Sequence, residues 1–266
     1  MNFSDQQKNQ TTKCRIEAEQ ICVDYNGTVA LYDASLKVDE GCICGLVGMN
    51  GAGKSTFFKA LMGFIRPSRG KIQINGMSVS KAQGDQAVAY VPQSEGIDCS
   101  FPVSVWDVVM MGRYGSMNAM RIPRESDRRA VWHALERVDL IDLRKKPIGS
   151  LSGGQRKRTF LARAIAQRAS VLLLDEPFSG VDVPTEKLMA DLFLQFKQER
   201  RTILISTHDL SHVREFCDLV VLINKTVLAY GETSEIFTSE NLNMTFGGLS
   251  PDPLFGSTST QEDTFN

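Results

Sequence analysis

The sequence predicts an α/β protein with a mainly parallel, buried β-sheet and a helical insertion. Three continuous apolar segments separated by helical patterns are typical of strands that are buried on both faces. They are 171-VLLLD-175, 202-TILIST-207 and 219-LVVLI-223. Residues 94–150 have a different, helical character, so we expect them to form an insertion within the α/β core.

Further elements precede the insertion. Residues 16–47 read as short β-strands, and the last of these, 43-ICGLV-47, runs directly into glycines. The spacing i, i+3, i+4, i+7 predicts a helix over 54–65, with its apolar face formed by Phe58, Leu61, Met62 and Ile65. The segment 71-KIQINGMSV-79 predicts a strand, a turn at Asn75-Gly76 and a second strand.

Two helices are predicted by local signals. One apolar stripe in the insertion is formed by Ala130, Val131, Ala134, Leu135 and Val138. Pro184 suits the first turn of the helix that follows the strand 171–175, because a proline there removes no helical hydrogen bond.

The length, composition and net charge are those of an ordinary globular protein. The 266 residues allow one large domain or two small ones, and 42% hydrophobic with 23% charged residues is ordinary for a globular chain. We expect one continuous globular region, 15–249, between a disordered N-terminus, 1–14, and a disordered tail, 250–266. The net charge of −1 provides no global positive field, so we expect no nucleic-acid partner.

The N-terminus has no apolar core and is therefore not read as a signal peptide. No window approaches the roughly 18 uninterrupted apolar residues of a spanning helix. Work at a membrane would thus need a partner.

The six cysteines form no CxxC pair, which favours small buried hydrophobes in a reducing cytosol over a metal site. Cys42 and Cys44 alternate in a predicted strand and so share a face. The full set is Cys14, Cys22, Cys42, Cys44, Cys99 and Cys217.

A complete phosphate-binding loop stands at 48-GMNGAGKST-56, after a predicted strand and before a predicted helix. Its glycines let successive N–H groups point at phosphate oxygens, and the helix N-terminus adds positive charge. Lys54 is expected to reach the β- and γ-phosphates, and Ser55 to offer its hydroxyl to Mg²⁺. The nucleotide-binding residues expected here are Gly48, Asn50, Gly51, Gly53, Lys54, Ser55 and Thr56.

Two carboxylates end the strand in 171-VLLLDEPFSGVD-182. Asp175 can hold Mg²⁺, and Glu176 could polarise the water that attacks the γ-phosphate. His208 ends the strand 202–207 at the same sheet edge, where it could touch that phosphate. His212 shares a helical face with His208, but without the glutamate of HExxH we expect a structural or surface role.

The segment 151-LSGGQ-155 is a second candidate phosphate cradle, because a serine and two glycines precede a helical pattern. It has no lysine to meet a phosphate, and the chain already contains a complete phosphate loop. The residues alone leave open whose phosphate it would bind.

In this order the motifs resemble the nucleotide-binding subunit of ABC transporters. They are the phosphate loop, Gln93 in 90-YVPQ-93, LSGGQ, the strand-terminal Asp-Glu, 180-GVD-182 and His208. The resemblance covers residues 15–248. It implies an ABC-type P-loop ATPase core with a mainly parallel sheet, an N-terminal antiparallel β subdomain and a helical subdomain inserted at about 94–156.

The resemblance also implies a use for LSGGQ. In this family two subunits meet head to tail, so Ser152, Gly153, Gly154 and Gln155 are expected to bind ATP held by a second copy of the chain. Asp182 is similar to the loop aspartate that crosses the dimer interface. Tyr25 stands where the family stacks an aromatic ring on adenine, and Gln93 stands where a glutamine senses Mg²⁺ and the attacking water.

The absence of a spanning segment resembles the separate ATPase subunit of bacterial importers, which docks on permease subunits at the cytoplasmic face of the inner membrane. An apolar patch at helical spacing is a candidate contact, with core packing as the alternative. It comprises Val105, Trp106, Val109 and Met110.

The stretches 97–115 and 176–182 resemble the ATPases of manganese, iron and zinc importers. That implies an ATPase powering import of manganese or ferrous iron delivered by an extracytoplasmic binding protein, with zinc or a metal chelate as alternatives. The metal should not touch this subunit, and Cys99 is not read as a ligand. A soluble ABC-type regulatory ATPase without a permease is a further alternative.

Overall fold

The computed structural model describes residues 13–93 and 102–247. The predicted tail 250–266 and Cys99 lie outside these ranges, and so does the N-terminal segment except for its last two residues. The first strand begins at Cys14. No helix in the described ranges is both long enough and apolar enough to cross a membrane.

The central sheet has six strands in the order β10-β9-β3-β8-β7-β6. All neighbours are parallel except β10, which pairs antiparallel with β9, so the prediction of a mainly parallel sheet is confirmed. The strands are β3 Ile43–Val47, β6 Val88–Val91, β7 Val171–Asp175, β8 Thr202–Thr207, β9 Leu219–Asn224 and β10 Thr226–Glu232.

A second sheet is antiparallel, in the order β2-β1-β4-β5. Its strands are β1 Cys14–Tyr25, β2 Thr28–Asp39, β4 Arg69–Ile74 and β5 Met77–Ser78. With 12 residues each, β1 and β2 are longer than the short strands that we expected. Register shifts, with Gln20 and Asp33 at positive φ, break the alternation that marks one long strand in a sequence.

The turn predicted at Asn75-Gly76 is present, with φ of 54° and 72°. Helix α1, Lys54–Leu61, ends before the predicted limit of residue 65. Gly63 lies just beyond it at φ 66°, so the chain leaves the helix while Ile65 still packs against the core.

Two hydrophobic cores lie on opposite faces of the central sheet, and β3 contributes to both. Ile43 and Val47 belong to a core shared with the helices, while Cys44 and Leu46 belong to a core shared with α1 and the antiparallel sheet. Cys42 packs against the same core as Cys44, as their predicted common face requires. Burial of both faces explains why these strands are continuously apolar.

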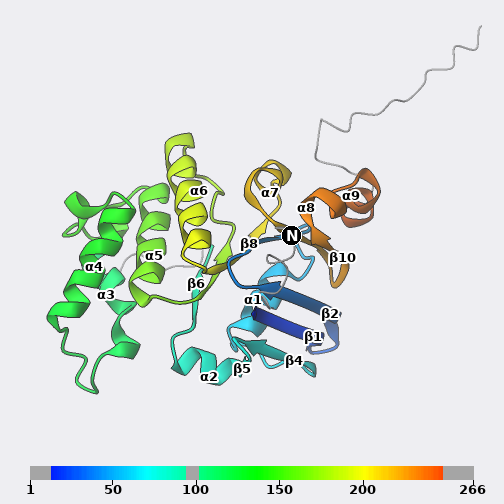
Figure 1. Cartoon of the computed structure of the whole chain (residues 1–266), viewed down its shortest axis with the longest axis horizontal. Helices are drawn as coiled ribbons and strands as arrows, with labels where there is room; N and C mark the ends of the chain where they lie inside the picture. Colours follow the sequence, from blue (N-terminus) through cyan, green and yellow to red (C-terminus); the bar gives the residue numbers. More distant parts are fainter. Residues whose placement is uncertain (1–12, 94–101, 248–266) are drawn as a thin grey trace, which may run out of the picture.

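Figure 1 places a helical subdomain at one side of the central sheet and the antiparallel sheet at the other. The helical subdomain comprises α3 Val105–Met111, η2 Tyr114–Ser116, α4 Glu125–Arg137, η3 Ile141–Leu143, η4 Ile148–Ser150 and α5 Gly153–Gln167. The remaining helices are α2 Val79–Gly84, α6 Val183–Gln198, α7 Leu210–Phe216, α8 Thr233–Ile236 and α9 Ser239–Phe246. Pro184 lies in the first turn of α6, as predicted.

All five residues of the stripe predicted for α4 are buried: Ala130, Val131, Ala134, Leu135 and Val138. The candidate permease patch on α3 is mostly core instead. Val105, Val109 and Met110 are buried in the core shared with α5, and Trp106 packs against it partly buried. The patch is therefore explained by core packing, and its apolar spacing does not indicate an exposed contact.

Candidate functional site

The phosphate loop connects β3 to α1 at the carboxyl edge of the central sheet, and two of its glycines are required by close packing. A Cβ at Gly48 would lie 2.3 Å from the carbonyl oxygen of Ile223. Gly53 has a φ of 99°, and a Cβ added there would lie 2.7 Å from Leu31 Cδ2. Side chains at these points would displace backbone, so these two positions of the loop require glycine.

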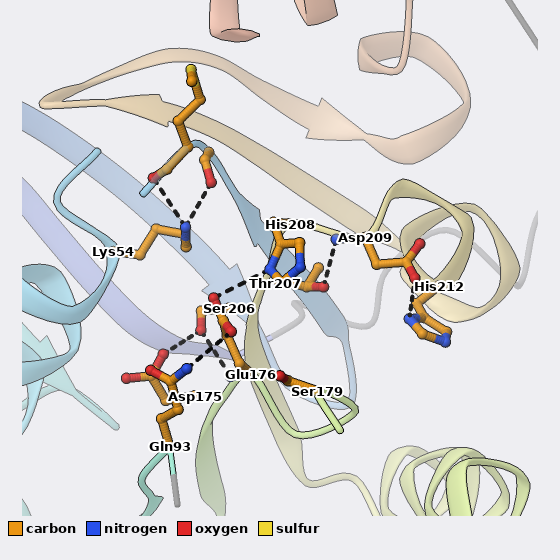
Figure 2. Close-up of polar contacts among 12 residues, drawn as sticks. Lys54, Gln93, Asp175, Glu176, Ser179, Ser206, Thr207, His208, Asp209 and His212 are labelled. Carbon is orange, nitrogen blue, oxygen red and sulfur yellow. Dashed lines mark hydrogen bonds and ion pairs between the residues drawn. The ribbon is translucent and has the colours of Figure 1, made fainter. Parts of the chain in front are cut away.

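Lys54 begins α1 and is buried, with its amine inside the loop (Figure 2). Its Nζ donates to the carbonyl oxygens of Gly48, at 2.6 Å, and Met49, at 3.1 Å. Burial lowers the pKa of the Lys54 amine, while Glu176 and Asp175 act in the opposite direction. A buried cation close to two carboxylates and a loop of N–H donors suits a polyphosphate bound with a divalent cation.

Asp175 ends β7 and is held by two hydroxyl donors. Tyr90 Oη donates to its Oδ2 at 3.1 Å, and Ser206 Oγ donates to its Oδ1. Burial raises the pKa of Tyr90, and the charge of Asp175 raises it further, so the phenol remains a donor. Neither contact could be found from the sequence, because Tyr90 and Ser206 come from other strands of the sheet.

Glu176 follows Asp175 with φ of 46°, a left-handed conformation unusual for glutamate. Its backbone N–H donates to the carbonyl and hydroxyl oxygens of Ser206, both at 3.1 Å. Its carboxylate accepts from Gln93 Nε2 at 3.2 Å and lies 3.3 Å from His208 Nδ1. Figure 2 shows these three side chains converging from separate segments.

These residues surround a cavity of about 370 Å³. Its lining comprises Ala30, Met49, Asn50, Gly51, Gly53, Lys54, Ser55, Thr56, Gln93, Glu176 and His208. Ala30 and Met49 were not predicted, because neither carries a reactive group. Tyr25 is exposed at the end of β1 and Asp175 is buried, and neither is among the lining residues. The volume, the cradle of glycines and the paired carboxylates fit a nucleotide with Mg²⁺.

The LSGGQ segment does not line this cavity. Ser152 caps α5 by accepting from the N–H of Gln155, whose side chain accepts from the Ser152 N–H in return. A Cβ at Gly154 would lie 3.5 Å from Asp182 Oδ1, and one at Gly153 would lie 3.8 Å from the carbonyl oxygen of Gly180. LSGGQ and the loop of Asp182 therefore form one joint surface, with Ser152, Gly153 and Asp182 exposed.

Lys157, which was not predicted as a site residue, connects this surface to the segment that follows β7. Its buried amine donates to the carbonyl oxygens of Glu176, at 3.0 Å, and Ser179. His212 lies apart, with Nε2 2.7 Å from Glu186 Oε1 and its ring 4.5 Å from that of Phe178. These contacts give His212 the structural role that was expected.

The described ranges contain no group of three His, Cys, Asp or Glu side chains placed to hold a metal ion. Within them, the cysteines are free thiols. Burial raises the pKa of the Cys217 thiol to about 12, so it remains protonated and unreactive at neutral pH.

A phosphate loop, a strand-terminal Asp-Glu pair and a helix-capping LSGGQ on one α/β core define a nucleotide-hydrolysing cassette. The family model described as ABC transporter matches residues 31–179, more than half of the chain. The chain belongs to the ABC transporter family, and it is an ATPase of that family.

The chain is similar to curated proteins over most of its length. It is 57% identical to the manganese transport system ATP-binding protein MntA of Synechocystis, covering 88% of this chain and 90% of that protein. It is 53% identical to the chelated iron transport system membrane protein YfeB of Yersinia pestis, covering 87% and 78%. A solved metal-chelate type ABC transporter in an inward-facing conformation superposes with a TM-score of 0.78 at 33% identity, covering 88% of this chain and 89% of the solved chain.

Proposed function

We propose that this chain is the ATP-hydrolysing subunit that powers import of manganese or ferrous iron through a membrane permease. The observation that carries the metal assignment is the 57% identity to a manganese transport ATP-binding protein across 88% of the chain. The similarity to a chelated iron transport protein supports iron as well as manganese. The metal assignment depends on sequence similarity to these relatives, because an imported metal would pass through the permease and not through the ATP site.

The ATP site would work by positioning and electrostatics. The N–H groups of residues 48–56 and the Lys54 amine would hold the β- and γ-phosphates, and Tyr25 would stack on adenine. Mg²⁺ would be held by Ser55, by Asp175 through water and by Gln93, and it supplies charge neutralisation at the phosphates when bound. The two hydroxyl donors on Asp175 fix the orientation of that carboxylate.

Glu176 would then direct water at the γ-phosphate, since its carboxylate lines the cavity between Gln93 and His208. His208, with an exposed side chain, would steady the charge that develops on the phosphate. Gln93 also precedes the helical subdomain in the chain, so it would link the nucleotide to the surface that meets the permease.

A head-to-tail dimer would complete each site. The cavity contains the phosphate loop, whereas LSGGQ and Asp182 lie on a separate exposed surface of the same chain. Two copies facing each other would place Ser152, Gly153, Gly154 and Gln155 on ATP bound by the partner, with α5 supplying a positive helix N-terminus. The protein would then lie at the cytoplasmic face of the inner membrane, attached through its permease.

The substrate is tested by uptake of radiolabelled manganese, ferrous iron and zinc, supplied singly and in competition. Cells would express the whole transporter with either the wild-type chain or Glu176→Gln. We expect manganese or ferrous iron uptake that is lost in the variant. Uptake of zinc alone would make zinc the transported metal in place of manganese or ferrous iron. No uptake of any metal, with ATPase activity intact, would remove the metal assignment and keep the ATPase.

A membrane fractionation separates transport from a soluble regulatory role. We expect the chain in the membrane fraction only when its permease is expressed. Recovery in the soluble fraction regardless of the permease would favour the regulatory alternative.

We predict that Tyr90→Phe raises the Mg²⁺ concentration for half-maximal ATPase activity by about ten- to a hundredfold. The change removes one of two donors to Asp175, and a hydrogen bond to a charged group contributes about 1.5–3 kcal/mol. Tyr114→Phe in η2 is the matched control and should leave the Mg²⁺ dependence unchanged. Equal Mg²⁺ curves for Tyr90→Phe and wild type would show that Tyr90 does not position Asp175.

A further inference from the structure

A second cavity, of about 440 Å³, lies at the end of the central sheet opposite the phosphate loop. Its walls come from α4, from the end of α5 and from Arg201 in the turn between α6 and β8, elements that can be followed in Figure 1. We call it the arginine pocket. Its basic lining residues are Arg129, His133, Arg137, Arg168 and Arg201.

Helical spacing explains why so many basic groups meet here. Arg129, His133 and Arg137 follow one another at i, i+4 and i+8, so they share one face of α4. Arg168 ends α5 in a left-handed conformation at φ 61°. Four separate guanidinium groups thus border one concave space, and the proposed ATPase function uses none of them.

One carboxylate, that of Glu199, pairs with the arginines of the pocket. Glu199 Oε1 lies 2.8 Å from Arg137 Nη1, and Glu199 Oε2 lies 3.0 Å from Arg201 Nε, so this carboxylate pairs with two guanidinium groups. Both of these arginines also stack on the ring of Phe196, with Cζ 4.8 Å (Arg137) and 5.2 Å (Arg201) from the ring centroid. Across the described part of the chain, Arg129 and Arg168 make no side-chain ion pair, so the pocket keeps an excess of positive charge.

The guanidinium of Arg201 is largely buried. Its Nη1 is buried, and no acceptor for it occurs among residues 13–93 and 102–247. Burial lowers the pKa of its guanidinium; Glu199 opposes this effect, and the like charges of Arg137 and Arg168 add to it. A cation in such surroundings is stabilised by any further negative charge that comes within a few ångströms.

We propose that the arginine pocket binds a small anion carrying two or more phosphate or carboxylate groups. Guanidinium groups bind both kinds of oxyanion through paired hydrogen bonds. The volume lies within the range of small-molecule sites, and the net charge of −1 for the chain argues against an extended nucleic-acid surface. Such an anion would connect the helical subdomain, through Arg129 and Arg168, to the core at Arg201.

The test is isothermal titration calorimetry at constant physiological ionic strength, with the phosphate loop saturated by Mg²⁺ and ADP. Fructose 1,6-bisphosphate is the phosphate probe and tricarballylate is the carboxylate probe. We expect saturable binding of at least one probe, and the stronger of the two identifies the kind of oxyanion. The double variant Arg129→Ala/Arg168→Ala should weaken that binding at least tenfold.

Arg128→Ala is the matched control, because Arg128 is exposed on α4 and does not line the pocket. It should bind as wild type does. The two arginines of the double variant are exposed and make no ion pair with residues 13–93 or 102–247, so circular dichroism and ATPase turnover should be unchanged. If the double variant nonetheless unfolds, Arg168→Glu alone should give the same loss of binding.

Three results would overturn the proposal. The first is no binding of either probe to the wild type at millimolar concentration. The second is equal binding by the double variant and the control, which would place the anion elsewhere. The third is arginine-dependent binding of polyglutamate with neither small probe bound, which would make the pocket a protein-docking surface.

Discussion

Glu176→Gln should lower the rate of ATP hydrolysis by about 10²- to 10⁴-fold while leaving ATP bound. A general base contributes an effect of about this size, and glutamine keeps the shape of the side chain without its charge. The amide can still contact Gln93 and His208, so the loss would lie in the chemical step and not in the architecture. Single-turnover kinetics with labelled ATP measure it directly.

The same variant should accumulate a closed dimer in the presence of ATP and Mg²⁺, because ATP would bridge the two copies of the proposed head-to-tail dimer and the variant would not hydrolyse it. Size-exclusion chromatography with and without nucleotide would detect the dimer. Glu215→Gln, an exposed position on α7, is the control and should turn over as wild type. Undiminished turnover in Glu176→Gln would remove this residue from the role of base.

Lys54→Ala should weaken ATP binding itself by about 10²- to 10³-fold. The amine is buried among loop carbonyls and near two carboxylates, and removing one partner of a buried charged interaction costs about 2–5 kcal/mol. Equilibrium binding of a fluorescent ATP analogue measures the change. Hydrolysis should fall at least in proportion, because fewer sites would be filled.

Lys59→Ala is the matched control for Lys54, since Lys59 lies exposed in the last turn of the same helix. It should bind ATP as wild type does. An unchanged ATP affinity in Lys54→Ala, together with normal folding, would contradict the assignment of residues 48–56 as the phosphate loop.

The parts of the fold that the sequence predicted well are those that depend on local pattern. The strands 171–175 and 202–207 agree with β7 and β8 to the residue, because both faces of the sheet are buried and every position is constrained. The phosphate loop is equally local, since its glycines, Lys54 and Ser55 are adjacent in the chain. The long strands β1 and β2 were underestimated because bulges interrupt their alternation.

The parts that could not be predicted depend on contacts between distant segments. Tyr90 reaches Asp175 across 85 positions of the chain, and no local signal identifies an ordinary strand tyrosine as such a donor. Lys157 looks like one charged residue of a helix, yet its amine is buried against the carbonyl of Glu176. The arginine pocket likewise exists only because three elements meet, so composition could not reveal it.

The left-handed backbone of Glu176 has a consequence for how this protein can evolve. A non-glycine residue in this conformation costs about 1–2 kcal/mol, and a glycine would avoid that cost. Selection for thermal robustness alone would therefore favour losing the glutamate, whereas selection for turnover would retain it. A lineage that kept the cassette only as a scaffold should drift at this position first, and glycine there would mark a descendant that had given up hydrolysis.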